Sequence, residues 1–229
     1  MVPTELRAAI GGHPLVARTL TQRGLSEPSA ALAFIDPNQY QPTSPQEMPG
    51  IDLAVERLVS ALTHKEQVCI WGDFDVDGQT STTLLVSALR ELGGEISYHI
   101  PVRATESHGV NLPGLSNELT KGAKLILTCD TGITANKAVE YAQRQGVDVI
   151  ITDHHEPAIA GEKRGRGETE KYKDEDSPPH RFSQLPNQSF HLPDALAIIN
   201  PKLSQPRSPS SNLSGAGVAL KLVHALSML

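Results

Sequence analysis

Short apolar runs of strand length recur along the chain and are separated by segments with helical periodicity. The runs span 68–71, 96–100, 125–129, 147–152 and 195–199. Two helical segments, 80–92 and 134–145, end at glycine, the residue most often found just after a helix. Strands that alternate with helices are typical of a parallel sheet. The pattern predicts an α/β fold, with a parallel β-sheet flanked by helices on both faces.

The first 50 residues follow a different pattern. A short helical segment, "HPLVARTLTQRG", ends at Gly24, and a proline-rich stretch follows up to Pro49. We interpret residues 1–50 as an arm packed on a main domain of residues 51–229. That domain opens with a helix whose apolar residues form one stripe, and Asp52 is placed to cap its first turn.

Residues 158–192 interrupt the pattern of the main domain. They are polar, mixed in charge and nearly free of aliphatic side chains, so they bury too little surface to offset the entropy lost on ordering. We expect a disordered surface insertion. A basic arm that grips nucleic acid is the alternative, but acidic residues are as frequent here as basic ones.

Composition and charge limit the classes of protein to which the chain can belong. Of the 229 residues, 38% are hydrophobic and 20% are charged, and no apolar run approaches the roughly 18 residues of a membrane helix. Cys69 and Cys129 lie inside apolar runs, which favours core thiols in a reducing compartment. We therefore expect a soluble, cytoplasmic protein with no membrane partner. The net charge of -6 argues against non-specific coating of nucleic acid, but it is compatible with an acidic metal site.

Acidic residues and histidines follow three of the predicted strands. The segment "GDFDVDG" supplies Asp73, Asp75 and Asp77, "LTCDTGIT" supplies Asp130, and "IITDHHEP" supplies Asp153, His154 and His155. In an open parallel sheet, ligands bind outside the carboxyl ends of the strands. Carboxylates this close together repel one another unless cations neutralise them. Oxygen and imidazole ligands without thiolates favour Mn²⁺ or Mg²⁺, and two such ions could activate water for displacement at phosphorus.

The first acidic motif has other interpretations. An EF-hand calcium loop also begins D-x-D-x-D-G, but its twelfth residue is glutamate, and here that position is Leu84. A phosphatase with an aspartate nucleophile also places D-x-D after a strand, yet it leaves the paired histidines unexplained. A solvated acidic turn is the alternative for this motif, and a helix cap is the alternative for Asp130. A lone histidine is usually structural, but an adjacent pair after an aspartate at a strand end favours a site.

Five motifs in order resemble the successive motifs of the DHH phosphoesterase superfamily: "GDFDVDG", "TCDTGIT", "TDHHEP", "AIINPK" and "SGAGVALKL". The segments "HPLVARTLTQRGLSEPSAALAFIDP" and "AVERLVSAL" also resemble an exonuclease branch of it, so the resemblance covers nearly the whole chain apart from the insertion. It implies hydrolysis of phosphodiester or pyrophosphate bonds with Mn²⁺ or Mg²⁺. It also implies 5′ to 3′ degradation of single-stranded DNA in DNA repair and recombination.

The resemblance implies roles for individual residues as well. The metal ligands would be Asp75, Asp77, Asp130 and His154, with Asp73 in or beside their shell. His155 would be catalytic, facing the scissile phosphate, where it stabilises charge or protonates the leaving group. Asp153 would be the second catalytic residue and would act by orienting a histidine.

Two further segments are expected to bind substrate. Arg103 in "PVRATESHGVN" corresponds to a phosphate-contacting position of the superfamily, and a guanidinium matches the geometry of phosphate oxygens. The superfamily usually has Gly-Tyr where this chain has Ser107 and His108, so we expect His108 to alter the local contacts.

The second of these segments is "SGAGVAL". Ser214 is placed to cap a helix, and its first residues would present N–H groups to an anion. Those residues are Gly215, Ala216 and Gly217. An ordinary glycine-rich helix start is the alternative interpretation.

The resemblance stops at Leu229. In the superfamily another metal-ligating aspartate follows the glycine-rich helix, and a second domain closes over the substrate. No aspartate follows Asp194 here, so we expect one metal position to lack a ligand and the second, C-terminal domain to be absent. One possible function is an incomplete exonuclease acting on single-stranded nucleic acid, with DNA expected over RNA. The alternative is a weakly active or inactive module that binds metal or a partner protein, such as a missing C-terminal half.

Overall fold

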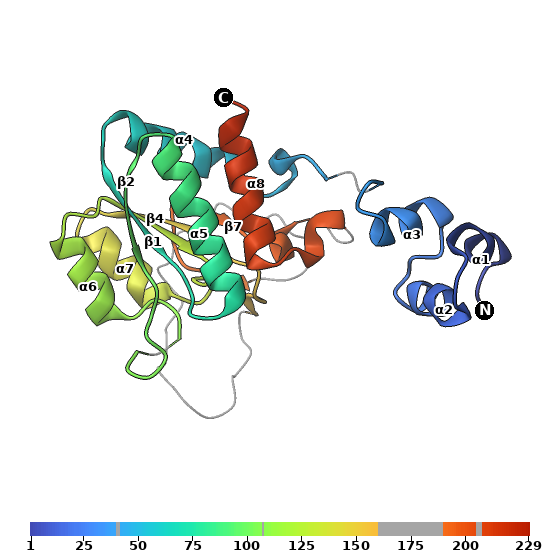
Figure 1. Ribbon diagram of the computed structural model, residues 1–229. Coiled ribbons are helices and arrows are strands. Elements are labelled where there is room, and N and C mark those ends of the chain that lie inside the picture. The colour runs from blue at the N-terminus through green and yellow to red at the C-terminus, as the bar shows by residue number, and fades with distance from the viewer. Residues whose placement is uncertain (40–41, 107, 160–189, 205–207) are drawn as a thin grey trace. The chain divides into compact units, whose positions relative to one another are not determined.

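The computed structural model describes residues 1–39, 42–106, 108–159, 190–204 and 208–229 (Figure 1). The chain divides into two compact units, Met1–Ser44 and Pro45–Leu229. The first unit contains α1 (Thr4–Ile10), α2 (Pro14–Gln22) and α3 (Pro28–Ile35). Its small core is formed by Leu6, Ala17, Leu20 and Ala31. The division falls between Ser44 and Pro45, whereas the sequence pattern placed it after residue 50.

The second unit is built on a five-stranded parallel sheet, as the alternating pattern predicted. Its strands are β1 (Gln67–Trp71), β2 (Glu95–His99), β3 (Leu125–Cys129), β4 (Asp148–Thr152) and β7 (Ala197–Ile199). The order across the sheet is β2-β1-β3-β4-β7, and every neighbouring pair is parallel. Because β1, β3 and β4 are adjacent, the segments that follow them meet at one edge of the sheet.

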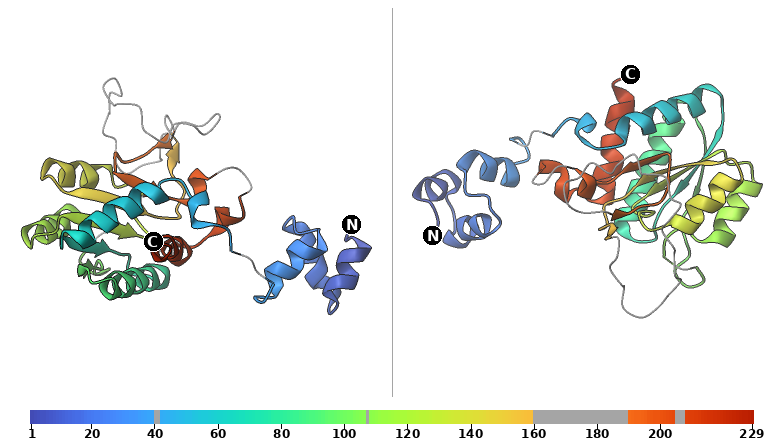
Figure 2. Two further views of the ribbon diagram at one scale, coloured as in Figure 1. Left: turned by 90° about the horizontal axis from the view of Figure 1, so that it is seen from above. Right: turned by 180° about the vertical axis from the view of Figure 1, so that it is seen from behind.

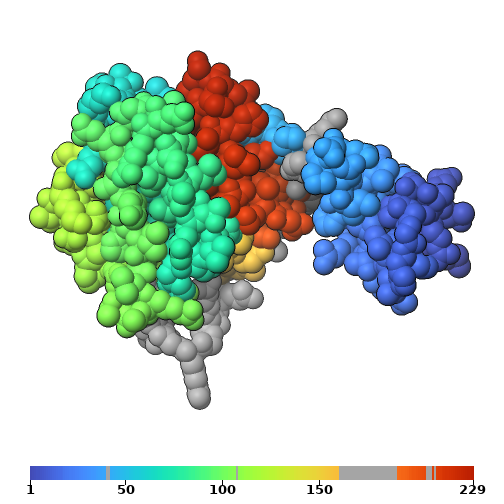
Figure 3. Space-filling view, in the orientation of Figure 1, coloured from blue at the N-terminus to red at the C-terminus, as the bar shows by residue number. Residues whose placement is uncertain are grey.

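Helices cover both faces of this sheet (Figures 1 and 2). One face carries α4 (Ile51–Thr63), α5 (Val76–Glu91) and α8 (Gly215–Ser227), and the other carries α6 (Leu112–Thr120) and α7 (Asn136–Arg144). Within β1, Val68 and Ile70 pack into the first layer, whereas Cys69 and Trp71 pack into the second. Burial on both faces explains why the strands read as continuous apolar runs. On the first face α5 and α8 lie side by side, as Figure 3 also shows.

Cys69 and Cys129 are both buried, and neither forms a disulfide. Burial raises the pKa of each thiol to about 12, so neither forms a thiolate near neutral pH. The prediction that both cysteines are core side chains is confirmed.

The start of α4 differs from the prediction. Gly50, and not Asp52, is the residue that precedes the helix, and Asp52 lies within the first turn. Gly50 has a φ of 80°, a left-handed conformation that glycine adopts at little cost. A Cβ at this position would lie 2.5 Å from the carbonyl oxygen of Ile198 in β7. The prediction of an Asp52 cap was wrong. The start of α4 packs closely on the sheet, and because this packing requires glycine at position 50, the helix begins directly after Gly50.

The helix α5 begins at Val76, earlier than the predicted start near residue 80. Asp75 is its N-cap, and Oδ1 of Asp75 accepts a hydrogen bond from the Gly78 N–H at 2.9 Å. The first N–H groups of a helix need acceptors outside the helix, and the acidic segment supplies one. The segment "DFDVDG" is therefore partly helical, with Asp77 in the first turn of α5.

The predicted insertion at 158–192 begins and ends in a short antiparallel pair, β5 (Ala158–Ile159) with β6 (Phe190–His191). Residues 160–189, on which the prediction of disorder depends, lie outside the described residues. Short 3-10 helices, η1 (Pro45–Glu47), η2 (Pro201–Leu203) and η3 (Pro209–Asn212), complete the second unit. Among the described helices, none reaches the length and apolar character that crossing a bilayer requires.

We expect Gly50→Ala to lower the free energy of unfolding by about 2 kcal/mol or more, because alanine adds a left-handed backbone cost and a clash with Ile198. Gly146→Ala is the matched control. Gly146 has a φ of 72° with nothing within 4 Å of its Cβ position, so only the backbone cost of about 1 kcal/mol applies. Urea denaturation measures both losses, and equal losses would contradict the packing role of Gly50.

Candidate metal centre

Three sequence motifs meet at the carboxyl edge of the sheet. Asp73 lies just beyond β1, Asp130 directly follows β3, and Asp153 directly follows β4. Because these strands are adjacent and parallel, their carboxyl ends lie next to one another. The fold therefore gathers acidic side chains that are far apart in the sequence.

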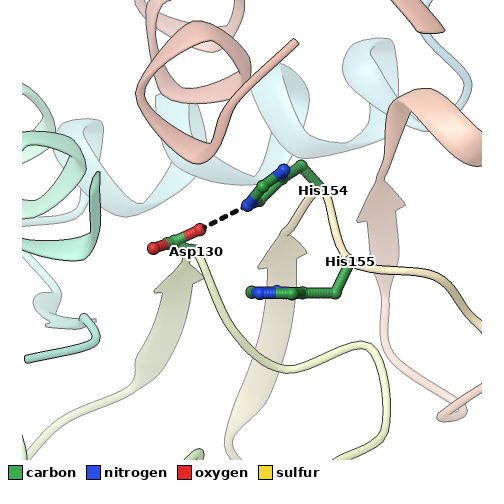
Figure 4. Close-up of side chains that lie close together, drawn as sticks. All are labelled: Asp130, His154 and His155. Carbon is green, nitrogen blue, oxygen red and sulfur yellow. Dashed lines mark ion pairs between the residues drawn. The ribbon is translucent and has the colours of Figure 1, made fainter. Parts of the chain in front are cut away.

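Asp130 and His154 form the closest pair among the predicted metal ligands. Oδ1 of Asp130 lies 3.0 Å from Nε2 of His154 (Figure 4), and Oδ2 of Asp77 lies 3.6 Å from the same nitrogen. One ligand atom each from Asp130, His154 and His155 all lie within 4.8 Å of one another. Asp77, Asp130 and His154 therefore converge, as the sequence led us to expect, and His155 joins them.

Asp73 and Asp75 stand apart from this group of ligand atoms. Asp75 is exposed and caps α5. Oδ1 of Asp73 accepts a hydrogen bond from the Phe74 N–H at 2.7 Å, and its Oδ2 lies 3.6 Å from Nδ1 of His108. Neither belongs to the group of Asp130, His154 and His155, whose ligand atoms all lie within 4.8 Å of one another.

The backbone turns sharply at Asp130. Its φ of 59° lies in the left-handed region, which aspartate tolerates better than most residues do. The Asp130 N–H donates to the carbonyl oxygen of Thr152 at 3.0 Å, which ties the end of β3 to β4. The turn is not a helix cap, because the N-cap of α7 is Ala135. It leads the Asp130 side chain toward His154 (Figure 4).

The amino terminus of α8 holds Asp77. The N–H groups of Gly215 and Ala216 donate to Oδ2 and Oδ1 of Asp77 at 2.7 and 2.8 Å. The Gly217 N–H donates to Ser214 Oγ at 3.3 Å, which confirms Ser214 as the helix cap. The sequence assigned these three N–H groups to a substrate anion, whereas here each has an acceptor within the chain. A helix amino terminus attracts an anion, and the fold brings Asp77 to this one.

Asp153 holds the two histidines in place. Its buried Oδ1 accepts hydrogen bonds from the N–H groups of His154 at 2.7 Å and His155 at 3.1 Å, and lies 2.7 Å from Nδ1 of His155. Oδ2 accepts the Ile133 N–H at 2.9 Å. Burial opposes ionisation of Asp153, but these hydrogen bonds outweigh it and lower the pKa of its carboxyl group. In turn, the contact with Asp153 raises the pKa of His155 to about 9, so that His155 is cationic at neutral pH.

Asp130 has the opposite environment. Burial, together with the negative charges of Asp77 and Asp75, raises the pKa of Asp130 to about 7. Its Oδ1 is buried and has no hydrogen-bond partner among the described residues, because the nearby Nε2 of His154 is close but not aligned to donate. A buried carboxylate oxygen left in this way is energetically costly.

This geometry fits a divalent cation. Ligands on neighbouring positions of an octahedral ion lie about 3 Å apart at ordinary metal–oxygen distances. The separation of 3.0 Å between Asp130 Oδ1 and His154 Nε2 agrees with that spacing. A Cβ at Gly215 would lie 2.4 Å from Asp130 Oδ1, so the glycine keeps the space beside the carboxylate open. Carboxylate and imidazole donors suit Mn²⁺ or Mg²⁺, and Asp77, Asp130 and His154 could hold such an ion.

Arg103 and His108, the predicted substrate contacts, lie against Phe74. Cζ of Arg103 is 5.1 Å from the centroid of the Phe74 ring, and the His108 ring centroid is 4.4 Å from it. The sequence analysis did not single out Phe74. An aromatic residue between two aspartates just after a strand was the signal that could have identified it.

Asn200 is a second residue to which the sequence assigned no role. Its Nδ2 donates to the carbonyl oxygen of His155 at 3.0 Å, and its Oδ1 accepts the Lys202 N–H at 2.8 Å. Nζ of Lys202 lies 3.3 Å from Oε1 of Glu156. The motif "AIINPK" thus braces the segment just after the paired histidines, and its asparagine at a strand end was the available signal.

The parallel sheet and the histidine-bearing acidic edge define the class of this domain. Residues 67–174 match the family described as DHH family, N-terminal domain. Within this class, the chain is similar to the single-stranded-DNA-specific exonuclease RecJ.

Two relatives and one solved structure show the extent of the similarity. RecJ of Bacillus subtilis (strain 168) is 34% identical over 213 residues, which cover 93% of this chain and 23% of that protein. RecJ of Dickeya dadantii (strain 3937) is 40% identical over 178 residues, which cover 77% of this chain and 26% of that protein. A crystal structure of exonuclease RecJ bound to manganese has a TM-score of 0.62 at 29% identity and covers 82% of this chain and 40% of that chain. The chain thus spans about a quarter of the length of these curated relatives.

We expect Asp130→Asn to stabilise the metal-free protein and to abolish stabilisation by Mn²⁺. A carboxyl whose pKa rises on folding from 3.8 to about 7 destabilises the fold as the pH rises between these values, and the full cost is present above pH 7. Asparagine tolerates the left-handed backbone and carries no charge, so the free energy of unfolding at pH 8 should rise by about 1–3 kcal/mol. Thermal unfolding in EDTA and in Mn²⁺ measures both effects.

The control for this variant is Asp194→Asn, at an exposed aspartate away from the acidic edge. It should change neither the metal-free stability nor the response to Mn²⁺. Because a ligand that binds only the folded state raises the melting temperature, a wild-type protein insensitive to Mn²⁺ would contradict the proposed cation site.

Asp153→Asn should lower the free energy of unfolding by about 1.5–3 kcal/mol. Asparagine replaces one carboxylate oxygen with an N–H donor, which leaves either the Ile133 N–H or the histidine segment without its acceptor. Glu156→Gln, at an exposed carboxylate that pairs with the half-buried Lys202, is the control and should cost roughly 0.5 kcal/mol or less. Urea denaturation compares the two, and similar losses would rule out the bracing role of Asp153.

Proposed function

We propose that this chain is the metal-binding catalytic domain of a single-strand-specific exonuclease that hydrolyses phosphodiester bonds with Mn²⁺ or Mg²⁺. The observation that carries the proposal is the buried Oδ1 of Asp130, which has no hydrogen-bond partner among the described residues and lies 3.0 Å from Nε2 of His154. The similarity to RecJ proteins, named as single-stranded-DNA-specific exonucleases, supports the substrate. The similar crystal structure of RecJ bound to manganese supports the metal.

The cation ligands in this proposal come from three segments of the chain. Asp77, Asp130 and His154 hold one ion, and Asp73 and Asp75 extend the acidic edge toward a second. Asp77 accepts two N–H groups from α8, but each carboxylate oxygen retains a second lone pair for a cation. When bound, such cations activate water and offset the negative charge that develops on the phosphate.

His155 supplies a proton donor beside these ligands. Its Nδ1 is engaged by Asp153, and its pKa of about 9 keeps the ring protonated at neutral pH. Nε2–H is then directed at a phosphate oxygen or at the leaving oxygen, whose charge it stabilises. Asp153 is a positioning residue, because it fixes the orientation of the His155 ring.

Arg103 and His108 bind the phosphates of the strand at the rim of the acidic edge. The Arg103 guanidinium matches the geometry of phosphate oxygens, and Phe74 lies beneath it. Local cations and these basic groups explain how a chain with a net charge of -6 receives an anionic polymer.

The cellular role in this proposal is DNA repair and recombination in the cytoplasm. Free, buried thiols at Cys69 and Cys129 suit a reducing compartment. DNA is proposed over RNA because the RecJ relatives are named for single-stranded DNA.

The proposal is tested by a single-turnover assay, with protein in excess over a 3′-labelled, 5′-phosphorylated single-stranded oligonucleotide. We expect slow, Mn²⁺-dependent loss of nucleotides from the 5′ end, and Asp130→Asn should lower the rate by at least ~100-fold because it removes a cation ligand. Asp194→Asn is the matched control and should retain the wild-type rate. Cleavage that proceeds without a divalent cation, or that Asp130→Asn leaves unchanged, would contradict the proposal.

Calorimetric titration with Mn²⁺ separates metal binding from turnover. Wild type should bind Mn²⁺, and His154→Ala should weaken binding because an imidazole ligand is lost. Binding without cleavage would replace the proposed hydrolase with a module that binds metal or a partner protein. Absence of Mn²⁺ binding would contradict both the proposed hydrolase and a metal-binding module, and would leave only a module that binds a partner protein.

A further inference from the structure

Glu106 lies at the centre of the segment that connects β2 to α6. Its Oε2 accepts the Val102 N–H at 2.7 Å. Its Oε1 accepts a hydrogen bond from Nδ2 of Asn111 at 3.1 Å and lies 3.1 Å from Nε2 of His99. The hydrogen bond from Val102, with smaller effects of Asn111 and His99 and against slight burial, lowers the pKa of Glu106, which stays ionised.

The partners of Glu106 belong to regular elements of the fold. His99 is the last residue of β2, and its ring stacks on the buried Trp71 with 4.1 Å between ring centroids. Asn111 is the N-cap of α6, where its Oδ1 accepts the Gly114 N–H at 2.8 Å. Glu106 therefore fastens the irregular segment to the end of a strand and to the start of a helix.

The same segment reaches the turn that carries Asp130. Nε1 of Trp71 donates to the carbonyl oxygen of Gly109 at 3.3 Å. Gly109 has a φ of 81°, and a Cβ there would lie 3.7 Å from Oγ1 of Thr131, the residue after Asp130. The end of this segment at Gly109 is therefore held by Trp71 and lies beside the turn that carries Asp130.

Two basic side chains flank Glu106 in the sequence and lie on one aromatic ring. Cζ of Arg103 is 5.1 Å from the Phe74 centroid, and the His108 ring is 4.4 Å from it. Nδ1 of His108 lies 3.6 Å from Oδ2 of Asp73. The N–H groups of Thr105 and Glu106 donate to the carbonyl oxygen of Val102 at 2.9 and 2.8 Å, and the side chain of Glu106 links this turn to Asn111.

We propose that Glu106 is a positioning residue for substrate binding, which holds Arg103 and His108 against Phe74 in the arrangement that receives the phosphates of a single strand. This inference rests on the proposed function. Long side chains on a loosely held segment lose conformational freedom when they bind, and that loss weakens affinity. Because Glu106 orders the segment before the substrate binds, much of this cost is removed. The carboxylate of Glu106 itself accepts hydrogen bonds from groups within the chain.

Simple electrostatics predicts the opposite effect of removing Glu106. Loss of a carboxylate near a phosphate-binding surface reduces repulsion and by itself strengthens the binding of nucleic acid. A positioning role predicts weaker binding in spite of the lost negative charge. The sign of the change in affinity therefore distinguishes the two.

The experiment measures the dissociation constant of a fluorescein-labelled single-stranded phosphorothioate oligonucleotide in Mn²⁺ by fluorescence anisotropy. We expect Glu106→Ala to weaken binding about 10-fold, because hydrogen bonds to an ionised group are lost. Glu106→Gln should restore part of this affinity, since its amide oxygen still accepts the Val102 N–H. Glu140→Ala removes a carboxylate from the exposed face of α7, where it pairs with Arg144, and should bind at least as tightly as wild type.

Three further measurements separate positioning from general damage. The single-turnover cleavage rate at saturating protein should stay within about 3-fold of wild type, because the cation ligands are untouched. In an Arg103→Ala background, Glu106→Ala should weaken binding much less, since its effect acts through Arg103. Thermal unfolding with and without Mn²⁺ should show an intact fold and an intact cation site in Glu106→Gln.

The possible failures are distinguishable. If Glu106→Ala binds as tightly as wild type, or more tightly, the positioning role of Glu106 is overturned and the proposed function stands. A wild-type protein that binds Mn²⁺ but no single-stranded DNA overturns the proposed nuclease itself, and with it any role of Glu106 in substrate binding.

Discussion

Asp130 is a carboxylate that the fold buries among other carboxylates, with 1% of its surface exposed. Burial and the charges of Asp77 and Asp75 raise its pKa to about 7, because each disfavours a further negative charge at this position. Such a group is unfavourable until positive charge is placed beside it. The surroundings leave room for that charge: His154 presents a ring nitrogen 3.0 Å away, and Gly215 lacks the side chain that would fill the space.

The chain itself stabilises the other carboxylates at this edge. Each accepts at least one backbone N–H group, and these carboxylates are Asp73, Asp75, Asp77 and Asp153. Hydrogen bonds from backbone N–H groups stabilise the ionised form without adding a net charge. The remaining need for positive charge is therefore concentrated at Oδ1 of Asp130, which receives no such bond. This contrast indicates where a cation would have its largest effect.

The surroundings of the acidic edge are organised by polar side chains of irregular segments. Asp153 fixes the paired histidines, Asn200 braces the backbone after them, and Glu106 ties together the segment that carries Arg103. All three form hydrogen bonds with backbone N–H or C=O groups that lie outside the hydrogen bonding of the helices and strands. In this domain the sheet supplies the positions of the site, and these side chains supply its rigidity.

The sequence by itself determined the parallel sheet, the helices on both faces, and the placement of Asp130 and His154 at one edge. Periodicity and the residues at strand ends are local properties, so they could be read without knowledge of the fold. Local reasoning failed at Asp52 and at the start of α5. At Asp52 a long-range contact of Gly50 sets the helix boundary, and at α5 the Asp75 cap extends the helix into the acidic motif.

Only the tertiary structure decided that the amino terminus of α8 holds Asp77, 138 residues away from Gly215, and that Glu106 links β2 to α6. A glycine-rich helix start attracts any anion, and the sequence cannot tell a carboxylate of the same chain from the phosphate of a substrate. Hydrogen bonds act over about 3 Å, so which partner is bound depends on how distant segments pack against one another.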